Sequence, residues 1–183
     1  MSRVTVPTRD QIPEASHAIY DQLQKSLGGR VPNMFSVLSN SPHALEGVVS
    51  LQRALARTLT ARTRHLISLA VSQVNGCHYC LSVHTFTSTR SRMTPEEIMN
   101  GRRGLASDPK EHAAAAFAKK LVELRGKVSE DDIGSLRAVG YSDAEILEII
   151  SLSAQFLLTN FINNAFDMEI DFPPVDVALP VTG

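Results

Sequence analysis

Residues 75–85 carry the most information in this chain and read Asn-Gly-Cys-His-Tyr-Cys-Leu-Ser-Val-His-Thr. Spacings of three and four residues place Cys77, Cys80 and His84 on one face of a helix. Two Cα atoms three residues apart in a helix are about 5 Å apart, which is within the range of a disulfide. The two cysteines could therefore be oxidised and reduced without loss of the helix.

The residues before the cysteines predict where this helix begins. Asn75-Gly76 is a plausible break after a preceding helix, so both sulfurs would lie in the first turn of the next one. Free backbone N–H groups and the helix dipole favour a thiolate there. The dipole favours Cys77 as the nucleophile, whereas a base one turn further along, His84, favours Cys80. We predict that Cys80 attacks and that Cys77 resolves the oxidised product as a disulfide.

Two other interpretations of the cysteine pair stay open. The pair could be ordinary core packing, or it could form half of a zinc site with His84 and either His65 or His78. No second Cys-x-x-Cys supplies the usual four ligands, because the chain has only two cysteines. We therefore predict redox chemistry with neither a metal nor a cofactor. We expect His78 to face solvent, and we expect the remaining histidines to be surface residues rather than ligands (His17, His43 and His112).

The rest of the chain predicts an all-α protein. Two long windows, 43–94 and 110–172, lack proline, and no segment alternates with the period of a strand. We predict helices over 9–27, 42–57, 61–74 and about 143–166, the last apolar on nearly every side and hence buried, within the chain or against another subunit. N-cap residues predict helix starts at five places, namely Ser41-Pro42, Thr94-Pro95, Asp108-Pro109, Ser129 and Ser142.

Length and composition limit the possible functions. The 183 residues suit one domain, with a motif region over 42–100, a helical region over 108–170 and an extended tail over 171–183. A net charge of -1 from 18 basic and 19 acidic residues, mixed along the chain, gives no reason to expect nucleic acid or an anionic membrane as a partner. Uninterrupted apolar stretches are shorter than the roughly 20 residues of a membrane span, and the first residues lack a signal-peptide core. We predict a cytoplasmic location.

At these residues the chain resembles the alkylhydroperoxidase D-like (AhpD-like), or carboxymuconolactone decarboxylase, family. Residues about 60–88 carry the resemblance, with weaker similarity at 31–35, 136–146 and 160–164. The resemblance implies an AhpD-like helical bundle that assembles into trimers or hexamers, with an active site near a subunit interface. It also implies a thiol peroxidase without haem or metal, in which Cys80 attacks the peroxide, Cys77 resolves the product and His84 relays protons.

One position departs from the family pattern. The family typically has a glutamate twelve residues before the first cysteine, and this chain has His65 there. A neutral His65 could hold a water or act as a base, but it lacks the negative charge that stabilises an imidazolium. His65 could also simply fill space on its helix. We count it among the candidate site residues, together with Cys77, Cys80 and His84.

These observations predict a cofactor-free thiol peroxidase that reduces a small hydroperoxide and is itself reduced by a dithiol or thioredoxin-like partner. One alternative is a homo-oligomeric redox sensor or binding module, in which disulfide formation changes helix packing. Another is lactone decarboxylation, which the second family name suggests. That chemistry does not require a cysteine pair, so the pair argues against it.

Overall fold

The computed structural model describes residues 2–179, which form nine α-helices, one short 3-10 helix and no strand. The predicted all-α class is therefore confirmed over this range. The elements are η1 Arg9–Gln11, α1 Glu14–Ser26, α2 Asn33–Leu38, α3 Pro42–Leu55, α4 Ala61–Val74, α5 His78–Arg90, α6 Pro95–Arg103, α7 Pro109–Glu123, α8 Glu130–Ala138 and α9 Asp143–Phe166.

The predicted helix starts are confirmed, because each N-cap side chain accepts a hydrogen bond from the backbone N–H of the third residue beyond it. The five N-caps are Ser41, Thr94, Asp108, Ser129 and Ser142. A side-chain oxygen at this position satisfies an amide that has no partner within the helix. Such bonds involve only residues close in sequence, so they can be inferred from the sequence.

The prediction of one helix over 9–27 is wrong. The segment is divided into η1 and α1 by Ile12, which is extended (φ -91°, ψ 155°), and Pro13, which is the N-cap of α1. A residue before proline is driven out of the α region, and proline has no N–H to donate, so the helix starts anew. The predicted end at residue 27 is confirmed to within one residue, since α1 ends at Ser26 and Gly28 follows at φ +79°. Helix α2 was not predicted.

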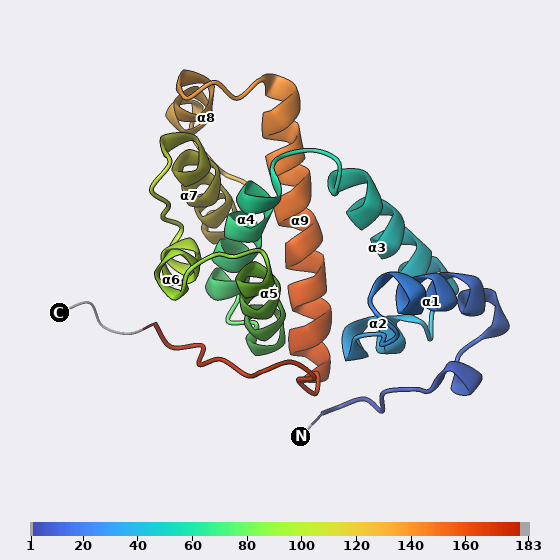
Figure 1. The fold of residues 1–183 in the computed structure, drawn as a ribbon. Helices are drawn as coiled ribbons and strands as arrows, with labels where there is room; N and C mark the ends of the chain where they lie inside the picture. Colours follow the sequence, from blue (N-terminus) through green and yellow to red (C-terminus); the bar gives the residue numbers. More distant parts are fainter. Residues whose placement is uncertain (1, 180–183) are drawn as a thin grey trace.

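Helix α9 is the axis of the structure (Figure 1). Helices α4–α8 lie on one side of it and α1–α3 on the other. Among residues 2–179 it is the one helix long and apolar enough to cross a membrane by length and composition alone. It nevertheless contacts five other helices and buries polar side chains, among them Gln155, Thr159 and Asn160, as expected of a central bundle helix.

The prediction that α9 is buried holds for only one side of it within this chain. Leu147, Leu158 and Phe161 remain 64%, 44% and 58% exposed. Their positions recur with the three-and-four spacing of a helical stripe, so they form one apolar face. No element of residues 2–179 covers this face.

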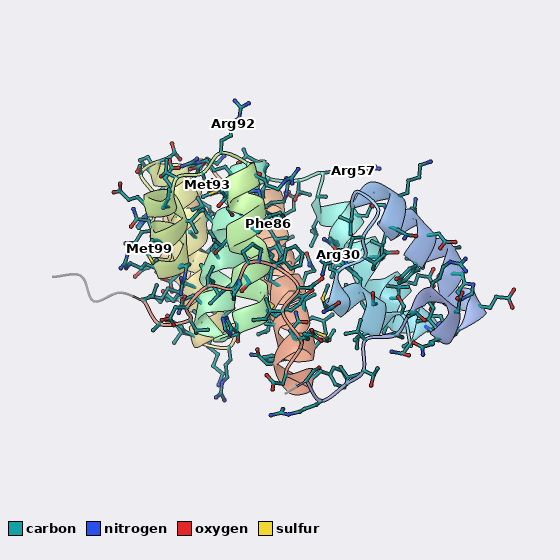
Figure 2. The ribbon with its side chains drawn as sticks, turned by 60° about the horizontal axis from the view of Figure 1, so that its bottom comes forward. Arg30, Arg57, Phe86, Arg92, Met93 and Met99 are labelled. Carbon is teal, nitrogen blue, oxygen red and sulfur yellow. A yellow bond between two sulfur atoms is a disulfide. The ribbon has the colours of Figure 1, made fainter. Side chains whose placement is uncertain are left out.

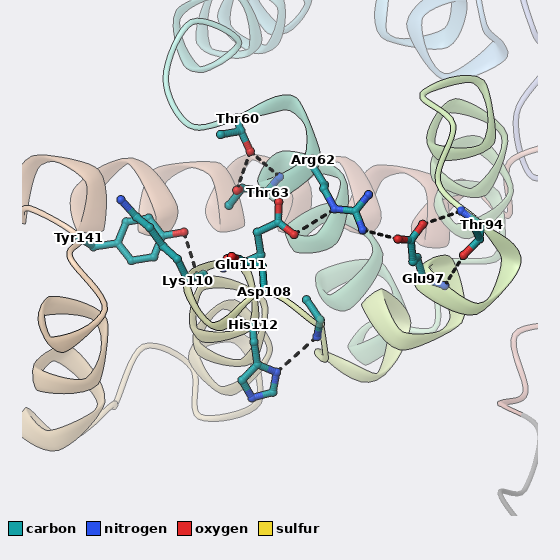
Figure 3. A network of polar contacts seen from close by, with 11 residues as sticks. Thr60, Arg62, Thr63, Thr94, Glu97, Asp108, Lys110, Glu111, His112 and Tyr141 are labelled. Carbon is teal, nitrogen blue, oxygen red and sulfur yellow. Dashed lines mark hydrogen bonds and ion pairs between the residues drawn. The ribbon is translucent and has the colours of Figure 1, made fainter.

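A charged cluster joins the helices around α4 (Figure 3). Arg62 in α4 donates to Glu97 of α6 at 2.7 Å and to Glu111 of α7 at 3.0 Å. Glu97 also accepts the backbone N–H of Thr94 at 2.7 Å. Arg62 therefore ties the starts of α6 and α7 to α4, which leads directly into the cysteine motif.

The N-terminal helices are fastened to the C-terminal segment that follows α9. Arg30 donates to Asp171 at 3.0 Å, and the same carboxylate oxygen accepts the backbone N–H of Asn33 at 3.2 Å. Figure 2 shows Arg30 at the seam between the N-terminal helices and the rest of the chain. The predicted tail 171–183 contains neither helix nor strand over 171–179, and residues 180–183 lie outside the described part.

Candidate active site

The turn between α4 and α5 has the geometry of a helix-terminating Schellman motif. Gly76 has φ +56°, its N–H bonds to the carbonyl of Gln73 at 3.1 Å, and the N–H of Cys77 bonds to that of Ser72 at 3.0 Å. Glycine adopts this left-handed conformation without the steric cost that a side chain would add. The predicted break at Asn75-Gly76 is thus confirmed, and it places Cys77 directly at the start of α5.

The two cysteines are joined as a disulfide at the N-terminus of α5. Their Cα atoms are 5.2 Å apart, which agrees with the predicted separation. Cys77 is the N-cap residue, and its sulfur accepts the backbone N–H of Cys80 at 3.3 Å. Cys77 is fully buried and Cys80 is 3% exposed. Both sulfurs therefore lie in the first turn, in their oxidised state, with little access to solvent.

The disulfide lies where the N-terminal helices meet α5. The two cysteines belong to an apolar cluster with side chains of α2 and α3. Tyr79, between the cysteines in sequence, accepts the backbone N–H of Met34 at 3.3 Å, and its ring packs edge-on against Phe172 at 6.1 Å. Burial raises the pKa of Tyr79, so the phenol stays protonated. The apolar surroundings exclude water from the sulfurs.

Buried asparagines of α9 fix the turn that precedes the cysteines. Asn160 is fully buried, accepts from the Nδ2 of Asn75 at 3.0 Å and donates to the Oγ of Ser72 at 3.3 Å. Asn164 donates to the carbonyl of Asn75 at 2.9 Å. These bonds satisfy polar groups that would otherwise be costly to bury. They also fix the start of α5 relative to α9.

A third asparagine of α9 contacts a cysteine directly. The Nδ2 of Asn163 donates to the Sγ of Cys80 at 3.2 Å, and the residue is 3% exposed. Its Oδ1 is buried and has no hydrogen-bond partner within residues 2–179. We did not select Asn163 from the sequence as a site residue. The signal that could have found it is the group of asparagines at 160–164 inside an otherwise apolar helix.

His84 lies one turn after Cys80 in α5, as its spacing predicts. Its ring packs edge-on against Phe156 of α9, with 5.0 Å between the ring centres. Burial lowers the pKa of His84 to about 3, and the charge of His65 acts in the same direction. His84 is therefore neutral near pH 7 while the disulfide is intact.

His65 lies on α4 and shares a hydrogen bond of 2.9 Å with the Oγ of Ser91. Burial, followed by the charge of Arg64, lowers the pKa of His65. A positive charge on His65 would also lower the pKa of His84, so the two imidazoles are coupled electrostatically. No hydrogen bond joins either ring to a cysteine sulfur among the described residues.

Among the other histidines, His78 is exposed as predicted, although it lies between the two cysteines in sequence. His43 is also exposed. His17 bonds to the carbonyl of Ile12 at 3.3 Å, and His112 accepts the N–H of Ala106 at 3.3 Å (Figure 3). Over residues 2–179, no three His, Cys, Asp or Glu side chains are grouped as a metal site would require. The zinc interpretation gains no support from this arrangement.

Comparison with known proteins shows which family the chain is similar to. Residues 42–120, which include the cysteine motif, match the model of the carboxymuconolactone decarboxylase family. The AhpD core protein of Ralstonia eutropha, an uncharacterised peroxidase-related protein, has a TM-score of 0.82 at 27% identity, covering 93% of this chain and 92% of that one. The chain is similar to this family over residues 42–120. Its fold is AhpD-like, as the resemblance implied.

Two more distant relatives complete the comparison. The chain is 22% identical over 129 residues to the uncharacterised protein YdfG of Bacillus subtilis, covering 68% of this chain and 88% of YdfG. The debrominase Bmp8 in complex with 2,3,4-tribromopyrrole has a TM-score of 0.77 at 20% identity, covering 93% of this chain and 94% of Bmp8. At this identity the likeness to Bmp8 shows the shared fold alone.

Proposed function

We propose that this protein is a cofactor-free thiol peroxidase that reduces small hydroperoxides. The observation that carries the proposal is the disulfide at the start of α5, with the amide of Asn163 on the sulfur of Cys80. A disulfide across two intervening residues closes too short a loop to add much stability, so a structural purpose explains it poorly. A pair that cycles between dithiol and disulfide explains it better.

In the proposed reaction, the Cys80 thiolate attacks one oxygen of the hydroperoxide. An S–O bond forms and the O–O bond breaks, so that Cys80 becomes a sulfenic acid and the other oxygen leaves as an alcohol or water after gaining a proton. The Cys77 thiol then attacks the Cys80 sulfur, forms the disulfide and releases water. The peroxide gains the two electrons that the sulfurs lose. A dithiol or thioredoxin-like partner restores both thiols by exchange.

His84 is the proposed proton carrier. Its pKa of about 3 belongs to the disulfide state, in which no negative charge lies on the sulfurs. Reduction would create a thiolate one turn away, and a nearby anion favours the imidazolium form. His84 can then accept the thiol proton and return it to the leaving oxygen. His65, bonded to Ser91, is proposed to support this relay in place of the family's glutamate.

Access and assembly complete the proposal. Only 3% of Cys80 is exposed, so the substrate must be small or the surrounding helices must open.

We propose that the exposed face of α9, with Leu147, Leu158 and Phe161, contacts further copies of the chain in a trimer or hexamer. We also propose that the protein acts in the cytoplasm, where thiol reductants keep such pairs reducible.

Steady-state peroxide consumption with a dithiol reductant tests the function. Cys80→Ser should abolish turnover, and Cys77→Ser should slow it strongly because only the external dithiol is left to react with the sulfenic acid. Thr89→Ala, an exposed residue of the same helix, should leave the rate unchanged. Unchanged turnover in Cys80→Ser would refute the assignment.

Two other results would replace the proposal rather than refine it. Stoichiometric disulfide formation without turnover under any dithiol reductant would favour a redox sensor. The same dithiol can also deliver two electrons to a carbon–halogen bond, so 2,3,4-tribromopyrrole belongs in the assay as a competing substrate. Its debromination with no peroxide consumption would contradict peroxidase activity.

A further inference from the structure

We infer that Asn163 is a catalytic residue of this site, whose amide stabilises the Cys80 thiolate and selects Cys80 rather than Cys77 as the attacking sulfur. The inference rests on the proposed function, because it assigns a role within the same dithiol chemistry. The inference does not depend on the cysteine motif or on the histidines. It depends on Asn163, which lies 83 residues from Cys80 in the chain.

The contact is with one sulfur only. The Nδ2 of Asn163 lies 3.2 Å from the Sγ of Cys80, and within residues 2–179 no side-chain amide donates to Cys77. An N–H donor binds an anionic acceptor about twice as strongly as a neutral one. The bond is therefore stronger to a thiolate than to a thiol or a disulfide, which lowers the pKa of Cys80. The sulfur of Cys77 accepts a backbone N–H, that of Cys80 at 3.3 Å, so the side chain of Asn163 is a donor that Cys80 alone has.

The setting of the amide strengthens this effect. Asn163 is 3% exposed and Cys80 is 3% exposed, so water cannot replace the bond. Burial in an apolar cluster would by itself raise the pKa of a thiol and suppress its reactivity. A buried nucleophile thus needs a donor that offsets desolvation, and Asn163 is the side chain that supplies one.

The oxygen of the same amide is placed to accept a hydrogen bond from a reaction intermediate. The Oδ1 of Asn163 is buried without a hydrogen-bond partner in the described part of the chain, and an unpaired buried carbonyl is destabilising. It is an acceptor on the same carboxamide that contacts the reacting sulfur. After oxygen transfer, Cys80 carries an S–O–H group, and the Oδ1 can accept that O–H while Cys77 attacks.

The position of the amide is fixed by the fold. Asn163 follows Asn160 by one turn of α9, and Asn160 is itself bonded to the residues that precede the cysteines. The backbone carbonyl of Asn163 also accepts the N–H of Met168 where α9 ends. The donor is therefore held in place before substrate arrives, as electrostatic stabilisation in an active site requires.

The test measures the Cys80 thiol in the reduced protein without peroxide. In a Cys77→Ser background Cys80 is the only thiol, and serine preserves the N-cap of α5. Thiolate absorbance against pH, together with the pH dependence of alkylation by iodoacetamide, gives the pKa of Cys80. Asn163→Leu, which keeps the size and removes the donor, should raise this pKa by about one to two units.

Two further variants make the result decisive. Asn163→Asp, nearly isosteric, places a negative charge beside the sulfur and should raise the pKa further. Ser153→Ala removes a buried hydroxyl of α9 that bonds only within the helix and should not shift it. A Cys80 pKa that is unchanged in both Asn163 variants would overturn the inference. If either variant fails to fold by circular dichroism, the other decides.

This measurement separates the inference from the proposed function. A shifted pKa without peroxide turnover in the unmodified protein would retain the role of Asn163 at the sulfur and reject the peroxidase reaction. Peroxide turnover in the unmodified protein, with a Cys80 pKa that the Asn163 variants do not shift, would retain the peroxidase reaction and reject the role of Asn163.

Discussion

Asn75 and Asn160 are 85 residues apart in sequence and are joined by a hydrogen bond of 3.0 Å between the Nδ2 of Asn75 and the Oδ1 of Asn160. This bond connects the turn before the cysteines to the central helix α9. The cysteine motif is therefore positioned by the C-terminal half of the chain, and its geometry depends on polar groups buried inside α9.

Replacing Asn160 by leucine should destabilise the fold. The change leaves Ser72 Oγ without its donor and removes one of the two acceptors of the Asn75 amide, in a position that is fully buried. We expect the free energy of unfolding to fall by about 2–3 kcal/mol, measured by urea denaturation. Ser135→Ala, an exposed change on α8, should cost less than about 0.5 kcal/mol. Equal effects of the two changes would show that the asparagine bonds contribute nothing specific.

His65→Glu should raise the pKa of His84. At present the charge of His65 lowers that pKa, whereas a carboxylate at the same position would stabilise the imidazolium. We expect a rise of about one to two units, followed by NMR of the imidazole protons, with His84→Gln to assign the signal. Peroxide turnover at neutral pH should increase as well. His65→Gln, which is neutral, separates charge from shape, and a His84 pKa that stays low in His65→Glu would contradict the interpretation.

The lowered pKa of His84 also predicts how stability depends on pH. The pKa is about 3 in the folded oxidised chain against 6.5 when exposed, so the unfolded state binds more protons between these values. The contribution of neutral His84 to the free energy of unfolding is complete above about pH 6.5. It is lost as the pH falls toward 3, by up to about 1.4 kcal/mol per pH unit.

The substitution His84→Gln should make the free energy of unfolding depend less on pH. Between about pH 6 and pH 5 the unfolding free energy of the unmodified protein should fall more steeply than that of His84→Gln, because carboxylates titrate mostly at lower pH. Denaturation at several pH values measures both slopes. Parallel curves would mean that His84 titrates normally in the folded protein.

The small exposed area of Cys80 predicts selectivity for size. Since 3% of the residue is exposed, hydrogen peroxide should react faster than cumene hydroperoxide. The comparison is made by the second-order rate of oxidation of the reduced protein, followed by loss of free thiol. A faster reaction with the bulky peroxide would indicate that the site opens widely in solution.

Local features of the fold could be predicted from the sequence. The caps at Ser41, Thr94 and Ser142 depend on residues three positions apart, and the spacing of Cys77 and Cys80 follows from helix geometry. The division at Pro13 is also local. It was missed because the apolar pattern continues across the proline.

Contacts between distant segments could not be predicted in this way. Asn163 reaches Cys80 only because α9 packs against α5, and periodicity does not say which helices become neighbours. The same reason explains the exposed side of α9, whose apolar residues predicted full burial. It also explains the coupling of His65 to His84 across two helices.

Trapping of the sulfenic acid tests the central claim most directly. Reduced Cys77→Ser protein is treated with one equivalent of hydroperoxide in the presence of dimedone, and the labelled residue is identified by mass spectrometry, with Cys80→Ser treated alongside. We predict label on Cys80 in the first protein and little label on Cys77 in the second. Label on Cys77 alone would contradict the assignment of Cys80 as the attacking sulfur, and no label on either would contradict peroxide chemistry at this pair.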